Sequence, residues 1–178
     1  MKSINSILLG VLLMPAIGMA IGQHEVFEAS FASSKAYENA FMDVEVDALF
    51  SKGKQAWTVP AFWDGGMTWK VRFAAPEMGE YSYHAVATDK ANKGLNTGEQ
   101  TLTVTEYTGD NPLYKRGKLR ITDDRRHFEF ADGTPFFWLG DTWWKGLSKR
   151  ISYKGFQELT ADRKQKGFTV VQIVCGTY

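Results

Sequence analysis

The sequence predicts a mostly β protein in which an antiparallel β-sandwich precedes a β-hairpin and one βαβ unit. Between residues 24 and 107, short segments alternate apolar and polar residues and are separated by turn residues, the pattern of half-buried strands. Near the C-terminal end, two almost wholly apolar segments, 134–140 and 169–175, flank a stretch with helical spacing. The 178 residues are too few for a complete eightfold α/β barrel, which needs roughly 250 residues.

Residues 1–22 have the composition of a secretory signal peptide. They open with Met-Lys, continue with an apolar run from Ile7 to Ile17, and end in small residues. The pattern predicts cleavage after Ala20 or Gly22 and export to the periplasm or the extracellular space. The alternative is a buried N-terminal helix. The run is shorter than the roughly 20 residues of a transmembrane helix, so no membrane span is expected.

Residues 23–107 are expected to form a sandwich of immunoglobulin type. The expected strands are 26–31, 44–50, 69–73, 81–86 and 100–104. Six or seven strands in about 80 residues, without a convincing helix, are typical of that fold. Tyr81 follows the turn at Gly79 at the start of a strand, which is the position of a tyrosine corner, where a phenol hydrogen-bonds to upstream backbone.

Four aromatic residues flank the turn at 64–66, and their pattern leaves two interpretations open. They are Trp57, Phe62, Trp63 and Trp69. Exposed rings in this arrangement could stack on a sugar ring. Alternatively, Trp69 and Phe62 belong to the core and Trp63 covers a sheet edge, because a sandwich needs large side chains to fill the space between its sheets.

A linker at 108–118, which contains Asn111-Pro112, is expected to precede a second unit at 119–178. Strands at 119–122, 127–131 and 134–140 are joined by turns at 123–126 and Asp132-Gly133. A helix over 153–166 is expected to begin after Ser152 and to end before Gly167. With the strand at 169–176 it completes a βαβ unit. Two parallel strands and one helix cannot enclose a core, so this unit is expected to open a larger α/β domain.

Composition and motifs exclude several functions. The formal net charge of +1 gives no basic excess for binding nucleic acid. Cys175 is the single cysteine, which rules out an intramolecular disulfide, and it is expected to be buried in its apolar strand. The three histidines are scattered singly, and the sequence has no phosphate-binding loop or dinucleotide fingerprint. We therefore expect no metal, no cofactor and no nucleic-acid partner.

Several segments resemble a family of secreted bacterial proteins. The segments are 27–31, 37–41, 62–66, 69–73, 107–114 and, most specifically, Asp132–Trp144. The family joins an N-terminal immunoglobulin-like domain of unknown function to an apiosidase-like glycoside hydrolase barrel. The resemblance implies that the chain is the N-terminal part of a (β/α)8 enzyme acting on plant-type polysaccharide, with the sandwich as an accessory domain and carbohydrate as the partner. The alternative is a non-catalytic carbohydrate-binding or structural sandwich module.

The resemblance also suggests which residues line a sugar pocket. Active sites of such barrels lie at the carboxyl ends of the strands. The candidates after the first expected strand are Asp141, Thr142, Trp143 and Trp144, with Gln172 and Tyr178 as weaker ones. The alternatives are a capping carboxylate for Asp141 and barrel packing for the two tryptophans. A glycosidase needs two carboxylates, and the resemblance places that pair beyond Tyr178, so we expect no catalytic residue in this chain.

Overall fold

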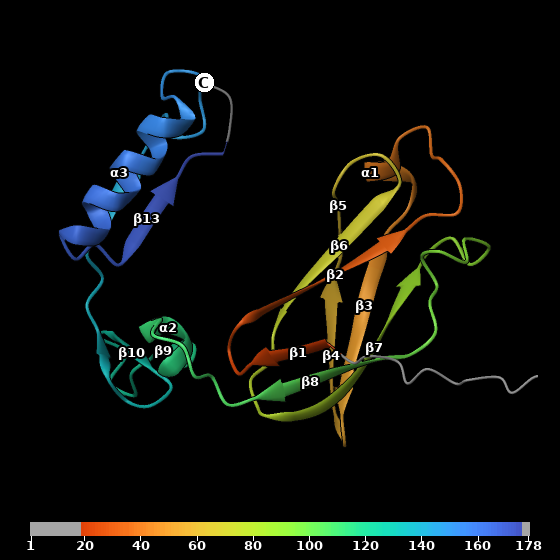
Figure 1. The fold of residues 1–178 in the computed structure, drawn as a ribbon, viewed down its shortest axis with the longest axis horizontal. Coiled ribbons are helices and arrows are strands. Elements are labelled where there is room, and N and C mark those ends of the chain that lie inside the picture. The colour runs from red at the N-terminus through yellow and green to blue at the C-terminus, as the bar shows by residue number, and fades with distance from the viewer. Residues whose placement is uncertain (1–18, 176–178) are drawn as a thin grey trace, which may run out of the picture. The chain divides into compact units, whose positions relative to one another are not determined.

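The computed structural model describes residues 19–175, which are rich in strands and divide into two compact units (Figure 1). Unit 1 ends at Asp110 and unit 2 begins at Asn111. Each unit has its own sheets, and Figure 1 labels most of their strands and helices.

Within the described residues, unit 1 contains a five-stranded and a three-stranded sheet. The first has the order β1-β8-β7-β3-β4 and the second β2-β6-β5. The first sheet consists of β1 (Met19–Gly22), β8 (Gln100–Thr105), β7 (Gly79–Ala87), β3 (Val46–Lys52) and β4 (Gln55–Pro60). The second consists of β2 (Val26–Ala32), β6 (Thr68–Ala74) and β5 (Phe62–Trp63). All pairs are antiparallel except β1 with β8. This is the strand order of a variable-type immunoglobulin sandwich.

Aromatic side chains from both sheets meet in the core of unit 1. The ring of Phe50, on β3, stacks on Phe73, on β6, with their centroids 4.1 Å apart. It also stacks on Tyr83, on β7, at 5.3 Å, and meets the edge of Phe27, on β2, at 6.2 Å. Phe50 is completely buried. These contacts join the two layers of the sandwich because each sheet supplies two of the four rings.

The predicted tyrosine corner is confirmed at Tyr81. Its side chain is fully buried, and its Oη donates a hydrogen bond of 2.9 Å to the carbonyl oxygen of Glu77. The backbone N–H of Glu77 donates back to the same Oη at 3.3 Å. Gly79 between them has a φ of +127°, which a side chain would strain. Burial raises the pKa of the phenol, so the group remains a neutral donor.

A buried amide ties the connection between β7 and β8 to the segment after β2. Asn92 is 1% exposed, and its Nδ2 donates to Ser33 Oγ at 2.6 Å and to Tyr37 Oη at 2.8 Å. The Tyr37 hydroxyl in turn donates to Asp89 Oδ2 at 2.8 Å, and Lys35 Nζ lies 2.6 Å from the same oxygen. These groups, Lys35 first, lower the pKa of Asp89 to about 2.

The N-terminal strand overlaps the segment that the sequence assigns to a signal peptide. Residues 1–18 lie outside the described part of the chain, but Met19–Gly22 form β1, in register with Leu102–Thr105 of β8. Ile21 packs against the core. A boundary after Gly22 therefore conflicts with the sandwich, because cleavage there would remove a paired strand.

Unit 2 begins with a short helix and a small antiparallel sheet. The short helix α2 (Pro112–Lys115) starts after Asn111, whose side chain accepts from the Leu113 N–H. A three-stranded antiparallel sheet then has the order β11-β10-β9. Its strands are β9 (Leu119–Ile121), β10 (Phe128–Phe130) and β11 (Pro135–Phe136).

Unit 1 also contains a short helix, α1 (Ala40–Asp43), where the sequence predicted no helix.

The predicted βαβ unit is present in unit 2. Strands β12 (Gly140–Trp143) and β13 (Val170–Ile173) pair in parallel, and α3 (Tyr153–Gln165) connects them. As expected, the Ser152 Oγ accepts the Gly155 N–H at 3.1 Å. Gly167, past the helix end, has a φ of +80°.

The prediction of a single buried strand over 134–140 is wrong. β11 covers only two residues and pairs with the hairpin, whereas β12 begins at Gly140 and pairs with β13. Between them the Leu139 N–H donates to the Phe137 carbonyl oxygen at 3.0 Å, a tight turn that ends one sheet before the next begins. Phe137 and Trp138 are consequently 75% and 54% exposed.

Removing the corner hydroxyl should weaken unit 1. Tyr81→Phe deletes the buried hydrogen bond to Glu77, and we expect a loss of about 1 kcal/mol in the free energy of unfolding, measured by urea denaturation of the whole chain. Tyr153→Phe is the control, because Tyr153 is 79% exposed. Equal stability of Tyr81→Phe and the unchanged chain would contradict the role given to this hydroxyl.

Asp89 should contribute to the acid sensitivity of the fold. Its pKa is lowered from 3.8 to about 2 in the folded chain, so its stabilising contribution is present above pH 4 and disappears as the pH falls towards 2. In Asp89→Asn, the melting temperature should fall less steeply across this interval. Lys35→Met should flatten the same curve, and added salt should reduce both differences because the pair is partly exposed. An unchanged slope in Asp89→Asn would contradict this assignment.

Candidate functional site

Three of the four candidate sugar-binding residues belong to the first parallel strand, and the fourth follows it. Asp141, Thr142 and Trp143 lie within β12, and only Trp144 follows it. The sequence placed all four after the strand, which is wrong for three of them because β12 begins at Gly140. The three residues within β12 pair with Val171, Gln172 and Ile173 of the parallel strand β13.

The alternation of the strand sends Asp141 and Trp143 towards α3. An Arg163 Nε from α3 donates to Asp141 Oδ2 at 2.6 Å. The Trp143 ring meets the Phe156 ring of α3 edge to face, with centroids 5.2 Å apart. Thr142 lies on the opposite face of the two-stranded sheet, beside Gln172.

Asp141 therefore acts within the packing of β12 and α3. The Arg163 guanidinium, and next the Trp143 indole N–H at 3.1 Å, hold the pKa of its carboxyl below the usual range. A carboxylate kept ionised by a cation is poorly suited to protonate a leaving group. This geometry suits Asp141 to orient α3 against β12. Such a structural role is closer to the alternative interpretation of this carboxylate than to sugar binding.

The two tryptophans differ in their accessibility. Trp143 is 7% exposed and packs under α3, as the packing alternative expected, whereas Trp144 is 60% exposed. Thr142 is half-buried. Among the four candidates, Thr142 and Trp144 are therefore the side chains best placed to contact a ligand. Tyr178 lies outside the described residues.

Sequence reasoning missed Arg163. Its partner Asp141 is 22 residues away, and an arginine in the last turn of a helix is common near the negative end of the helix dipole. The basic residue at the helix end was the available signal, but nothing in the sequence connects it to β12.

Other features of unit 2 also differ from expectation. Cys175 is exposed, although its apolar strand predicted a buried thiol. Val171 is 38% exposed, so β13 is only half covered. Across residues 19–175, no three histidine, cysteine or carboxylate side chains gather in a way that could hold a metal ion. No helix in the same range has the length and apolar character needed to traverse a membrane.

Two families match successive parts of the chain. Residues 20–88 match a domain of unknown function, DUF5060, and residues 122–177 match a family described as apiosidase-like, catalytic domain. The chain is glycoside-hydrolase-like, with an N-terminal domain of unknown function. The second match contains β12, α3 and β13, and the first contains most of the sandwich strands.

A solved structure supports this likeness over most of the chain. It is a "putative glycoside hydrolase" from Bacteroides vulgatus, 26% identical, with a TM-score of 0.68 over 87% of this glycoside-hydrolase-like chain. The match spans only 28% of the Bacteroides protein. Extracellular domains of the voltage-gated sodium channel beta4 subunit match 53% of this chain and 96% of their own at 10% identity and a TM-score of 0.28, too low to support an argument. No curated protein matches the chain.

Neighbouring tryptophans provide a matched test of packing in unit 2. Trp143→Ala should remove the contact with Phe156 and destabilise unit 2 by about 3 kcal/mol, because a buried ring is replaced by a cavity. Trp144→Ala should change stability by less than about 0.5 kcal/mol, since the side chain is exposed. The stabilities of the two variants are compared by urea unfolding, monitored through hydrogen exchange of the β12 and β13 amides. Similar losses for both variants would contradict the assignment.

Proposed function

We propose that this chain is the N-terminal part of an exported glycoside hydrolase that acts on plant-type polysaccharide. Unit 1 serves as the accessory domain, and unit 2 opens a (β/α)8 catalytic domain. The observation that carries the proposal is the parallel β12–α3–β13 unit, which falls inside the match to an apiosidase-like catalytic domain. The right-handed repetition of such units builds the barrel in which these active sites occur.

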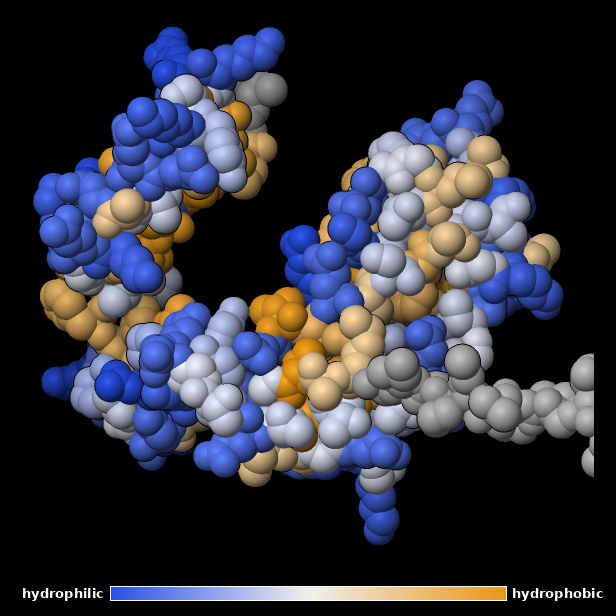
Figure 2. Space-filling model, in the orientation of Figure 1, coloured by the Kyte–Doolittle hydropathy of each residue, from blue (hydrophilic) through white to orange (hydrophobic). Residues whose placement is uncertain are grey.

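The half-covered parallel pair supports the barrel. Parallel sheets in proteins are normally covered on both faces. Figure 2 shows hydrophilic residues over the viewer's side of α3 and hydrophobic residues along its flank, where Figure 1 places β13. In a barrel, α3 would cover the outer face, and the face that carries Thr142 and Gln172 would turn inward.

The chemistry of glycoside hydrolysis requires two carboxyl groups on either side of the scissile bond, about 5 to 10 Å apart. Asp141 is paired with Arg163, and the second carboxylate on this arginine, Asp162, is paired with it as well. The proposal therefore assigns both catalytic carboxylates to segments outside residues 19–175. Trp144 and Thr142 would contribute substrate contacts, the indole by stacking on a sugar ring and the hydroxyl by hydrogen bonding.

The coding sequence that follows Tyr178 tests the catalytic part directly. We expect about six further βα units with two carboxylates at strand ends. For the 178-residue chain itself, we expect no release of reducing sugar from plant cell-wall polysaccharides above a no-protein control. Sugar release that disappears in Asp141→Asn would contradict the placement of the catalytic pair. A stop codon after Tyr178 in intact related genes would favour the alternative, a non-catalytic carbohydrate-binding or structural module.

Export can be tested at the N-terminus. Because Met19–Gly22 pair with β8 in the sheet, we propose that the leader ends before them, after Gly18, where Ala16 and Gly18 supply the small residues at positions −3 and −1. Expression in a bacterial host, followed by N-terminal sequencing of the exported protein, should give Met19 as the first residue. A first residue of Gln23 would contradict this site, and retention of residues 1–18 would contradict export by cleavage.

A further inference from the structure

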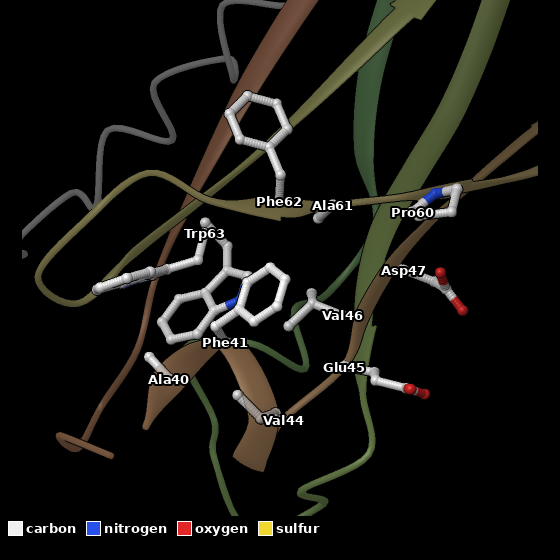
Figure 3. Close-up of a pocket in the computed structure, with 11 residues that line it drawn as sticks. Ala40, Phe41, Val44, Glu45, Val46, Asp47, Pro60, Ala61, Phe62 and Trp63 are labelled. Atoms are coloured by element: carbon white, nitrogen blue, oxygen red, sulfur yellow. The ribbon is translucent and has the colours of Figure 1, made fainter. Parts of the chain in front are cut away.

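An open groove of about 440 Å³ lies on unit 1. One wall is formed by α1 and the start of β3, and the other by the segment Pro60–Trp63 (Figure 3). The buried Trp69, 2% exposed, also lines the groove. This volume is within the range of small-molecule sites, which are apolar concave surfaces with a few polar groups.

Two exposed aromatic rings give the groove its apolar character. Phe41, on α1, is 76% exposed, and Trp63, on β5, is 43% exposed. The Trp63 Nε1 donates to the carbonyl oxygen of Gly66 at 3.0 Å, so the indole is held in place by the turn that follows it. Gly65 and Gly66 in that turn have φ values of +99° and +54°, which suit glycine. A fixed ring loses little conformational freedom when it binds a ligand.

The neighbouring Phe62 also lines the groove, but its ring is oriented differently. Its ring points away from Trp63 and Phe41 in Figure 3, and the guanidinium carbon of Arg72 lies 4.9 Å from its centroid. The sequence left open whether the four aromatic residues bind sugar or belong to the core, and the structure gives them different positions. Trp69 is in the core, Trp57 packs on Phe73 and Tyr81, and Trp63 remains available in the groove.

Two carboxylates stand at the other end of the groove. Glu45 and Asp47 alternate with the buried Val46 at the start of β3, and Figure 3 shows their carboxylates on the far side from Trp63. Within residues 19–175, neither carboxylate makes a side-chain hydrogen bond or ion pair. The nearby Lys70 is already paired with Glu28 and Asp64. The groove thus offers acceptors that carry negative charge.

We propose that this groove binds a neutral polysaccharide chain. The apolar C–H face of a sugar ring packs on Trp63 and Phe41, and sugar hydroxyls donate hydrogen bonds to Glu45 and Asp47. The two negative charges disfavour acidic sugars, because like charges across an interface cost free energy. This inference rests on the carbohydrate partner of the proposed function, but it concerns unit 1 alone and needs no hydrolysis.

Affinity electrophoresis of the whole chain, in gels that contain xyloglucan or polygalacturonate, tests the site. We expect xyloglucan to retard the chain and polygalacturonate to leave its mobility unchanged. Trp63→Ala and Phe41→Ala should each weaken the apparent affinity for xyloglucan at least tenfold. Met78→Ala is the control and should bind as the unchanged chain does, because Met78 is 51% exposed but does not line the groove. Asp47→Asn should weaken xyloglucan binding and reduce the discrimination against polygalacturonate.

Each contrary outcome overturns the proposal. No retardation by xyloglucan, equal retardation by both polymers, or full binding by both Trp63→Ala and Phe41→Ala would do so. A dimer of the unchanged chain that dissociates in Phe41→Ala, seen by analytical ultracentrifugation, would show that a second copy occupies the groove instead. Since the readout is binding, a failure to hydrolyse polysaccharide leaves this test unaffected. Conversely, loss of xyloglucan binding leaves the proposed catalytic domain intact.

Discussion

The apolar face of a sheet is buried only when another layer covers it, and the two units meet this requirement differently. In unit 1 the two sheets cover each other, with Phe50 of one sheet stacked on Phe73 of the other. In unit 2 the two-stranded parallel sheet is covered by α3, through Trp143 on Phe156 and Asp141 with Arg163. Its strand β13 remains half exposed within the described residues. The two sheets of the sandwich therefore cover each other, whereas the parallel pair is covered by α3 and leaves β13 half exposed.

The way in which each sheet is covered also distinguishes residues used for packing from residues exposed at the surface. Asp141 and Trp143 hold α3 against β12, so their side chains are already engaged in contacts within the protein. Trp144 is 60% exposed and Thr142 lies on the opposite face of β12 from Asp141, which is why the proposed substrate contacts are given to these two residues. In unit 1, Trp69 fills the core, whereas Trp63 is held by its indole hydrogen bond at the surface. Burial thus separates residues that look equivalent in the sequence.

Features with local causes could be predicted from the sequence. The tyrosine corner depends on the five consecutive residues from Glu77 to Tyr81, and α3 depends on a serine at its start and a glycine past its end. The break in the apolar run 134–140 could not be predicted, because an apolar run looks the same in one strand or two. The pairing of Asp141 with Arg163 was equally hidden, since tertiary packing alone brings them together. At the N-terminus, one apolar stretch resembles both a leader and a strand, and pairing with β8 assigns its last four residues to the sheet.

The sheets of unit 1 cover each other, whereas the proposed barrel requires the parallel sheet of unit 2 to be the start of a larger one. Native-state hydrogen exchange of the 178-residue chain tests this requirement most directly. We expect amides of β3 and β7 to exchange at least about 100 times more slowly than those of β12 and β13, because local opening is easy where few apolar contacts are buried. Equal protection of the two pairs of strands would show that the parallel sheet is already complete and would contradict the account.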